Sequence, residues 1–267
     1  MGALNAIDVN VDMGESFGRW SLGDDAALMP YISSASIACG YHAGDPGAMR
    51  RTVAGAVKHG LQIGAHVSLP DLLGFGRRRM KVAPRDVTDY CTYQIGALAA
   101  FVRAEGGRLA HVKPHGALYA MASDDGEMAD AVARSVAEVD DSMLLVLLRR
   151  TDIEHVVAEH GVRLITEAFP DLGYEPDGSL MMEAVKQAWD PDQVARRAVR
   201  VAVEQRIDAR DGTDVPVDAS TICIHGDSPN APEVARAVAD ALRSAGVAVV
   251  PMAEIVDGSP KTSHTAR

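Results

Sequence analysis

The chain has 267 residues, with 26 Lys and Arg against 37 Asp and Glu, which gives a formal net charge of −11 at pH 7. Hydrophobic residues make up 47% and charged residues 24%, a composition that is typical of a folded globular protein and excludes general disorder. The acidic balance and the 4% aromatic content argue against nucleic acid as a partner and against a polybasic membrane anchor.

Short β-like runs alternate with helical runs along the whole chain. The apolar pattern predicts seven strands and a weaker eighth at Ala6–Met13, Ala35–Tyr41, Leu61–Val67, Leu109–Pro114, Met143–Leu148, Val162–Phe169, Thr221–Gly226 and Val247–Pro251. Strands that alternate with helices in this way indicate parallel pairing through right-handed crossovers. We expect one domain over residues 1–256, followed by a flexible tail at 257–267 that carries no function.

Several helix starts are marked by capping residues. Asp45 and Asp190 each precede a proline, which is the pattern of an N-cap followed by the first helical position. Asn230 and Glu233 have the spacing of a capping box. One stretch, Pro170–Asp190, shows neither clean periodicity nor a strand. It is predicted to be either a lid or binding loop, or a surface excursion without function.

Five of the predicted strands carry one apolar face and one polar face. The polar faces hold Asp8, Asn10 and Asp12 in the first strand, Ser36 and His42 along the second, Gln62, His66 and Ser68 along the third, His111, Lys113 and His115 along the fourth, and Thr221, Cys223, His225 and Asp227 along the seventh. Strands of an open parallel sheet are usually apolar throughout, because helices cover both faces. The common phase therefore predicts an α/β fold, a closed parallel (β/α) barrel of seven or eight strands with a polar interior.

The ionisable members of these faces fall at or just beyond strand carboxyl ends, where (β/α) barrels place their active sites. Gathering so many titratable groups costs stability unless they are paired or functional. We expect Asp12 to be a general base, Lys113 and His115 to stabilise an oxyanion or a phosphate, and His225 with Asp227 to orient or donate a proton. Lys113 could also form an internal ion pair with Asp12 or Asp227.

A second set of residues is expected to contact the substrate: Glu15, His42, His66, Arg77 and Glu167. Glu15 could instead cap a turn. Asp12, His42 and His66 would together make a two-histidine, one-carboxylate set for a divalent metal, although no HExxH motif supports it. Of the three consecutive arginines that begin at Arg77, we expect at most one to reach a ligand.

The three cysteines, Cys39, Cys91 and Cys223, are widely spaced and form no CxxC pair, so buried thiols in a reducing compartment are expected. The first twelve residues lack the basic and apolar pattern of a signal peptide, and no apolar run is long enough to span a membrane. We therefore expect a cytoplasmic protein. Walker and GxSxG motifs are both absent, so no nucleotide-binding motif is present.

Read in order, the motifs resemble the LamB/YcsF family, whose characterised members are A subunits of bacterial 5-oxoprolinase. The matching segments are NVDMGESFG at 10–18, IACGYHAGDP at 37–46, GAHVSLPDLLGFGRR at 64–78, QIGAL at 94–98, VKPHGALY at 112–119, EAF at 167–169 and ICIHGDS at 222–228. The chain departs from the family pattern between Pro170 and Glu183, where Leu172 and Glu183 stand at positions usually held by arginine.

The resemblance implies a barrel related to the polysaccharide-deacetylase (NodB-like) barrels. It also implies ATP-dependent opening of 5-oxoproline to L-glutamate together with two further subunits, B and C. Two alternatives stay open: a metal-dependent amide hydrolase that acts alone, and a non-catalytic subunit that binds a small acid. The sequence does not decide whether the protein binds a divalent metal.

Overall fold

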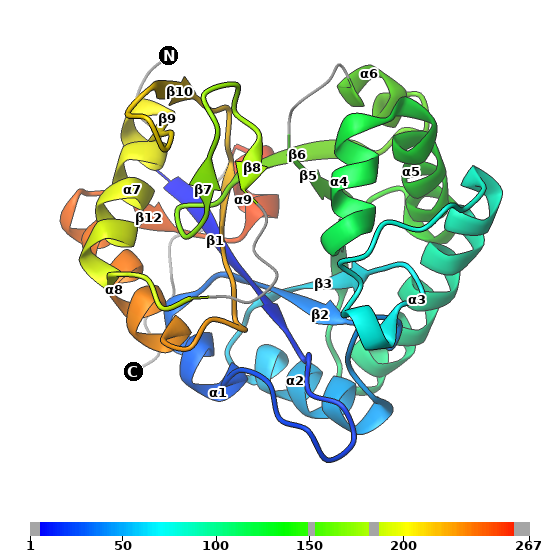
Figure 1. Ribbon diagram of the computed structural model, residues 1–267. Helices are drawn as coiled ribbons and strands as arrows, with labels where there is room; N and C mark the ends of the chain where they lie inside the picture. Colours follow the sequence, from blue (N-terminus) through cyan, green and yellow to red (C-terminus); the bar gives the residue numbers. More distant parts are fainter. Residues whose placement is uncertain (1–5, 149–152, 182–186, 259–267) are drawn as a thin grey trace.

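The chain folds into a closed parallel barrel (Figure 1). The structure is a computed structural model, and it describes residues 6–148, 153–181 and 187–258. Seven strands follow one another in the order β11-β6-β5-β4-β3-β2-β1, and β1 pairs with β11 to close the ring. Their bounds are β1 Ala6–Met13, β2 Ser34–Ala38, β3 Gln62–Val67, β4 Leu109–Pro114, β5 Leu144–Leu147, β6 Arg163–Ala168 and β11 Thr221–Ile224. An additional strand, β12 Ala248–Val249, pairs in parallel with the start of β1. The predicted barrel is confirmed.

Helices cover the outside of the barrel (Figure 1). The α-helices are α1 Asp25–Leu28, α2 Pro46–Lys58, α3 Pro84–Ala104, α4 Gly116–Asp124, α5 Gly126–Asp140, α6 Ile153–Ala158, α7 Pro191–Glu204, α8 Ala231–Ser244 and α9 Met252–Val256, with 3-10 turns η1 Met29–Tyr31 and η2 Leu72–Gly74. The apolar strand faces pack against these helices in one continuous core. Within the described residues, no helix is both long enough and apolar enough to cross a membrane.

Two helix caps form as predicted and one does not. The Asp45 carboxylate accepts hydrogen bonds from the amides of Gly47 and Ala48, and the Asp190 carboxylate accepts one from Asp192. The predicted capping box at Asn230 is wrong. Its side-chain amide donates instead to the carbonyl oxygen of Trp189, 2.8 Å away, and so ties the start of α8 to the segment before α7.

Two parts of the chain differ from the predicted elements. The second strand ends at Ala38 rather than Tyr41, because Gly40 adopts a φ of +97° and its amide turns back to the carbonyl of Ala43. The prediction that Pro170–Asp190 contains no strand is also wrong, since β7 Gly173–Tyr174 and β8 Leu180–Met181 form a short antiparallel hairpin. A second unpredicted hairpin joins β9 Arg206–Asp208 and β10 Asp214–Pro216. Residues 182–186, which include Glu183, and most of the predicted tail (259–267) lie outside the described residues.

The amino-terminal mouth of the barrel is closed by the last helix. Met252 of α9 packs against Leu144, Val146 and Ile165, and the amide of Ala253 donates to the Gln62 side chain, 3.1 Å away. Since this end is plugged, the carboxyl ends of the strands form the mouth at which the polar residues of the interior gather.

Asp8 lies deep in the barrel interior and is fully buried. Its carboxylate accepts hydrogen bonds from the hydroxyls of Ser33, Ser34 and Thr221. Burial nevertheless raises the pKa of Asp8 from 3.8 to about 6, because these hydrogen bonds offset the loss of hydration only in part.

The raised pKa predicts a pH-dependent stability. The native state holds the Asp8 proton more tightly than the unfolded chain, so this contribution to stability is complete below pH 4 and is lost as the pH rises through 6. Asp8→Asn removes the titration. Between pH 4 and pH 7 the variant should therefore gain about 2.4 kcal/mol in unfolding free energy relative to the wild type. Urea unfolding of both proteins across this range tests it, and a pH-independent difference would contradict it.

Candidate active site

Lys113, near the end of β4, is the centre of the polar cluster in the barrel. Its ammonium group lies 3.0 Å from the Asn10 side-chain oxygen, 3.0 Å from Asp12, 2.9 Å from the Cys223 sulfur and 3.2 Å from Glu167. Burial by itself would lower the pKa of Lys113, but Asp12, Cys223 and Glu167 outweigh it and raise the pKa well above its usual value. The lysine is therefore a permanent buried cation, and its predicted ion pair with Asp12 is confirmed.

Asp12, one residue before the end of β1, lies between Lys113 and His66. One carboxylate oxygen contacts Lys113, and the other lies 3.3 Å from Nε2 of His66. Burial would raise the pKa of Asp12, but the fields of His66 and Lys113 overcome it and hold the pKa well below its usual value. At neutral pH Asp12 is thus an ionised carboxylate beside the pocket, as a general base must be.

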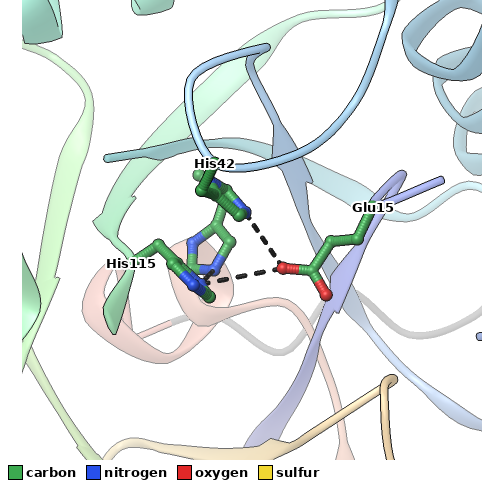
Figure 2. Close-up of side chains that lie close together, drawn as sticks. Glu15, His42 and His115 are labelled. Atoms are coloured by element: carbon green, nitrogen blue, oxygen red, sulfur yellow. Dashed lines mark hydrogen bonds and ion pairs between the residues drawn. The ribbon is translucent and has the colours of Figure 1, made fainter. Parts of the chain in front are cut away.

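His42, His66, His115 and Glu15 form a compact cluster beside Asp12. Figure 2 shows three of its members, Glu15, His42 and His115. The rings of His42 and His115 stack with centroids 3.8 Å apart, and Glu15 lies 3.0 Å from Nε2 of His42 and 3.7 Å from Nδ1 of His115. Burial lowers the pKa of His42 and of His115 well below the usual value. Burial together with Asp12 and Asp227 raises the pKa of Glu15. Glu15 is therefore built into the cluster and does not cap a turn.

The tautomer of His115 decides whether this ring can donate a hydrogen bond to an oxyanion, which is the role predicted for it. Its Nε2–H donates to the carbonyl oxygen of Phe75, 2.8 Å away, so a neutral ring presents only the bare Nδ1 to the cluster. A neutral His115 in this tautomer has no N–H left for an oxyanion. The structure thus leaves Lys113, and not His115, as the cation suited to that task.

The expected pair of His225 and Asp227 does not form. The side chain and the amide of His225 contact the carboxylate of Asp171, at 3.1 and 2.8 Å, while Asp227 pairs with Arg77 at 2.6 Å. Asp171 was not among the predicted site residues, because its neighbours in the chain suggest a turn. Its position just after β6 was the available signal, since the other site residues also follow strand ends.

Only the first of the three consecutive arginines reaches the site. Arg78 pairs with Asp71 and Arg79 with Asp124, whereas Arg77 contacts Asp227 and lines the pocket. Arg77 is thus the member of this run that lines the pocket, and its contact with a ligand stays a prediction.

A narrow pocket opens among these side chains, with a volume of about 40 Å³, which is room for a few water molecules. Its walls are formed by Asp12, His66, Arg77, Lys113, Pro114, His115, Gly116, Tyr119, Phe169, Leu172, Leu180 and His225. Leu172 and Leu180 belong to the segment that was predicted to be a lid or a surface excursion, and their place in the wall favours the binding-loop interpretation. Glu167 instead lies behind Lys113, which it contacts.

Gly76 is required for this packing. Its φ is +64°, and a Cβ there would lie 2.3 Å from the Ser68 hydroxyl, 2.8 Å from Cβ of His42 and 2.9 Å from His115. Gly76→Ala should therefore push the histidines apart, lower activity at least about tenfold and destabilise the fold by about 1–3 kcal/mol. The control is Gly106→Ala, where φ is +77° but no atom lies within 4 Å of the new Cβ. Equal losses of activity in the two variants would contradict this role.

Two groups of metal-ligating side chains occur in the described part of the chain. One is Glu15, His42, His66 and His115, and the other is Asp12, Cys223 and His225, with the donor atoms of each group within 4.8 Å of one another. His42 and His66 from the predicted metal set thus gather with Glu15 and His115, whereas Asp12 belongs to the second group. All three cysteines are buried free thiols, as expected.

Comparison with known proteins finds relatives that match nearly the whole chain. The chain is 48% identical over 245 residues to the 5-oxoprolinase A subunit of Thermus thermophilus, covering 91% of this chain and 98% of that relative. It is 47% identical over 244 residues to that of Nocardia farcinica, with the same coverage. The crystal structure of the lactam utilization protein from Thermus thermophilus superposes with a TM-score of 0.85 at 46% identity, over 92% of this chain and 99% of that one.

The sequence model of the LamB/YcsF family matches residues 7–257, nearly the whole chain. The match includes every residue of the pocket wall and every strand of the barrel apart from Ala6, the first residue of β1. The chain belongs to the LamB/YcsF family.

Proposed function

We propose that this chain is the A subunit of a 5-oxoprolinase, which opens the cyclic amide 5-oxoproline to L-glutamate. The relatives that cover nine-tenths of the chain carry this name, and a similar solved structure is a lactam utilization protein. The observation that carries the proposal is the ion pair of Asp12 and Lys113 in the pocket wall. A carboxylate base and a buried cation side by side suit an attack by water on an amide carbonyl.

The reaction must overcome the resonance of the lactam. Transfer of the γ-phosphoryl group from ATP to the amide oxygen, with ADP as the leaving group, would make the carbonyl carbon more electrophilic. Asp12 would take a proton from water as it adds to that carbon, and Lys113 would stabilise the negative charge of the phosphoryl oxygens. His225, oriented by Asp171, would donate a proton to the nitrogen as the C–N bond breaks. Hydrolysis of the resulting acyl phosphate by a second water would give glutamate and phosphate.

Arg77, the arginine in the pocket wall, would bind the carboxylate of the small anionic substrate. Leu172, at a position where the family usually has arginine, is buried and leaves this side of the pocket apolar. Because the pocket is narrow, the wall that carries Leu172 and Leu180 would have to shift to admit 5-oxoproline. The proposal thus makes the β7–β8 hairpin part of the binding site.

ATP and two partner chains, the B and C subunits, complete the proposed enzyme. The name that the relatives carry implies an assembly, and the chain offers no Walker motif of its own. We place the enzyme in the cytoplasm, where ATP is available and the three buried thiols stay reduced.

Reconstitution with the B and C subunits from the same organism tests the function. Glutamate and phosphate should both appear, and only when 5-oxoproline, ATP and all three chains are present. Glutamate release by this chain alone, without ATP, would favour an amide hydrolase that acts by itself. Thermal stabilisation by 5-oxoproline without any turnover of the full assembly would favour a non-catalytic binding role.

A further inference from the structure

Two histidines of the cluster face each other through nitrogens that both lack a proton when the rings are neutral. Nδ1–H of His66 donates to the carbonyl oxygen of Lys113, 2.9 Å away, and Nε2–H of His115 donates to that of Phe75. A backbone carbonyl is only an acceptor, so each ring must carry its proton on that outer nitrogen. The inner nitrogens, Nε2 of His66 and Nδ1 of His115, nevertheless lie 2.9 Å apart.

Such a contact between two lone pairs is repulsive unless a positive charge lies between or beside them. The surroundings favour a cation. Oε1 of Glu15 lies 3.7 Å from Nδ1 of His115, and Asp12 lies 3.3 Å from Nε2 of His66. Nε2 of His42 lies 3.0 Å from the same Glu15 oxygen, and these side chains are all nine-tenths or more buried. This cluster of buried imidazole nitrogens and carboxylate oxygens has the composition of a protein metal site.

We propose that Glu15, His42, His66 and His115 bind one divalent transition-metal ion, with zinc as the best match to three imidazoles and a carboxylate. In a tetrahedral zinc site with bonds of about 2.0–2.2 Å, neighbouring donor atoms lie about 3.4 Å apart. The observed separations of 2.9, 3.0 and 3.7 Å fall on both sides of that value. Small rotations of the side chains would then complete the site.

The backbone holds two of the ligands in the required orientation. The carbonyl oxygens of Lys113 and Phe75 select the tautomers of His66 and His115, in the way that outer hydrogen bonds orient metal-ligating histidines. His66 and His115 also line the pocket beside Asp12. Because four protein ligands fill a tetrahedral site, a divalent ion there would supply Lewis-acid character only by taking an oxygen of the substrate or of a phosphate as a fifth ligand. This inference refines the proposed site, but it can be tested without turnover.

The test uses the full-length protein, stripped with a chelator, dialysed and titrated with zinc or cobalt chloride. We expect one equivalent of either metal to remain after gel filtration, a cobalt absorption spectrum typical of a four-coordinate site, and a rise in Tm with zinc. His66→Gln and His115→Gln should each lose the bound metal and the spectrum. The matched control is His225→Gln, which changes a histidine of the other donor group and should retain both.

Two results would overturn the proposal. If the wild-type protein retains no stoichiometric metal and gives no cobalt spectrum, the two rings share a proton instead. If His225→Gln loses the metal while His115→Gln keeps it, the ion belongs to the group of Asp12, Cys223 and His225. Unfolding curves recorded without metal show whether a variant has lost its fold, in which case His42→Gln and Glu15→Gln take its place. Neither result would bear on whether the assembly forms glutamate, so this proposal and the proposed function fail separately.

Discussion

Replacing Lys113 with methionine is expected to lower kcat by about 10²–10³-fold and to destabilise the fold by about 3–5 kcal/mol. The activity falls because the cation beside the reacting oxygen is lost. The stability falls because Asp12 and Glu167, which both contact the ammonium group, remain as buried carboxylates without their partner. Steady-state assays of the reconstituted enzyme and urea unfolding of the isolated chain measure the two effects.

A double variant separates catalysis from folding. Lys113→Met combined with Glu167→Gln removes one of the two stranded carboxylates, so a large part of the lost stability should return while kcat stays low. If the double variant is no more stable than Lys113→Met, the buried charges are not the cause of the instability. If Lys113→Met alone retains wild-type kcat, the lysine has no catalytic role.

Asp12→Asn is expected to lower kcat by about 10²–10⁴-fold with a smaller effect on KM, because the amide cannot accept a proton from water. Its matched control is Asp8→Asn, a change of the same kind on the same strand. Both side chains point into the barrel, but Asp8 is buried among hydroxyls deep in the interior, whereas Asp12 lines the pocket at the carboxyl end.

The two variants should therefore behave in opposite ways. Asp8→Asn should keep wild-type kcat at neutral pH while it changes the pH dependence of stability, and Asp12→Asn should lose turnover while it remains folded. Circular dichroism and gel filtration check the fold of each protein before kinetics. Similar kcat values for the two variants would mean that Asp12 matters no more to turnover than Asp8 does, and would contradict its role as the general base.

The strand pattern of the sequence was sufficient to predict the barrel and the composition of its interior. Residues two apart on a strand share a face, so Asp8, Asn10 and Asp12 had to point the same way, as did Lys113 and His115. The carboxyl ends of parallel strands meet at one mouth. This is why strand periodicity alone led us to expect Asp12, Lys113, His66 and His225 together.

The partners of these side chains were decided only by the tertiary structure. Which groups touch depends on strand register, loop path and rotamer, and none of these is a local property of the sequence. His225 pairs with Asp171 rather than Asp227, and Asn230 binds Trp189 rather than its own helix. The tautomers of His66 and His115 depend on carbonyl oxygens of Lys113 and Phe75, which the fold brings to them from elsewhere in the chain. The sequence determined which side chains line the barrel, because strand periodicity is local, and the fold determined their contacts, because those join distant parts of the chain.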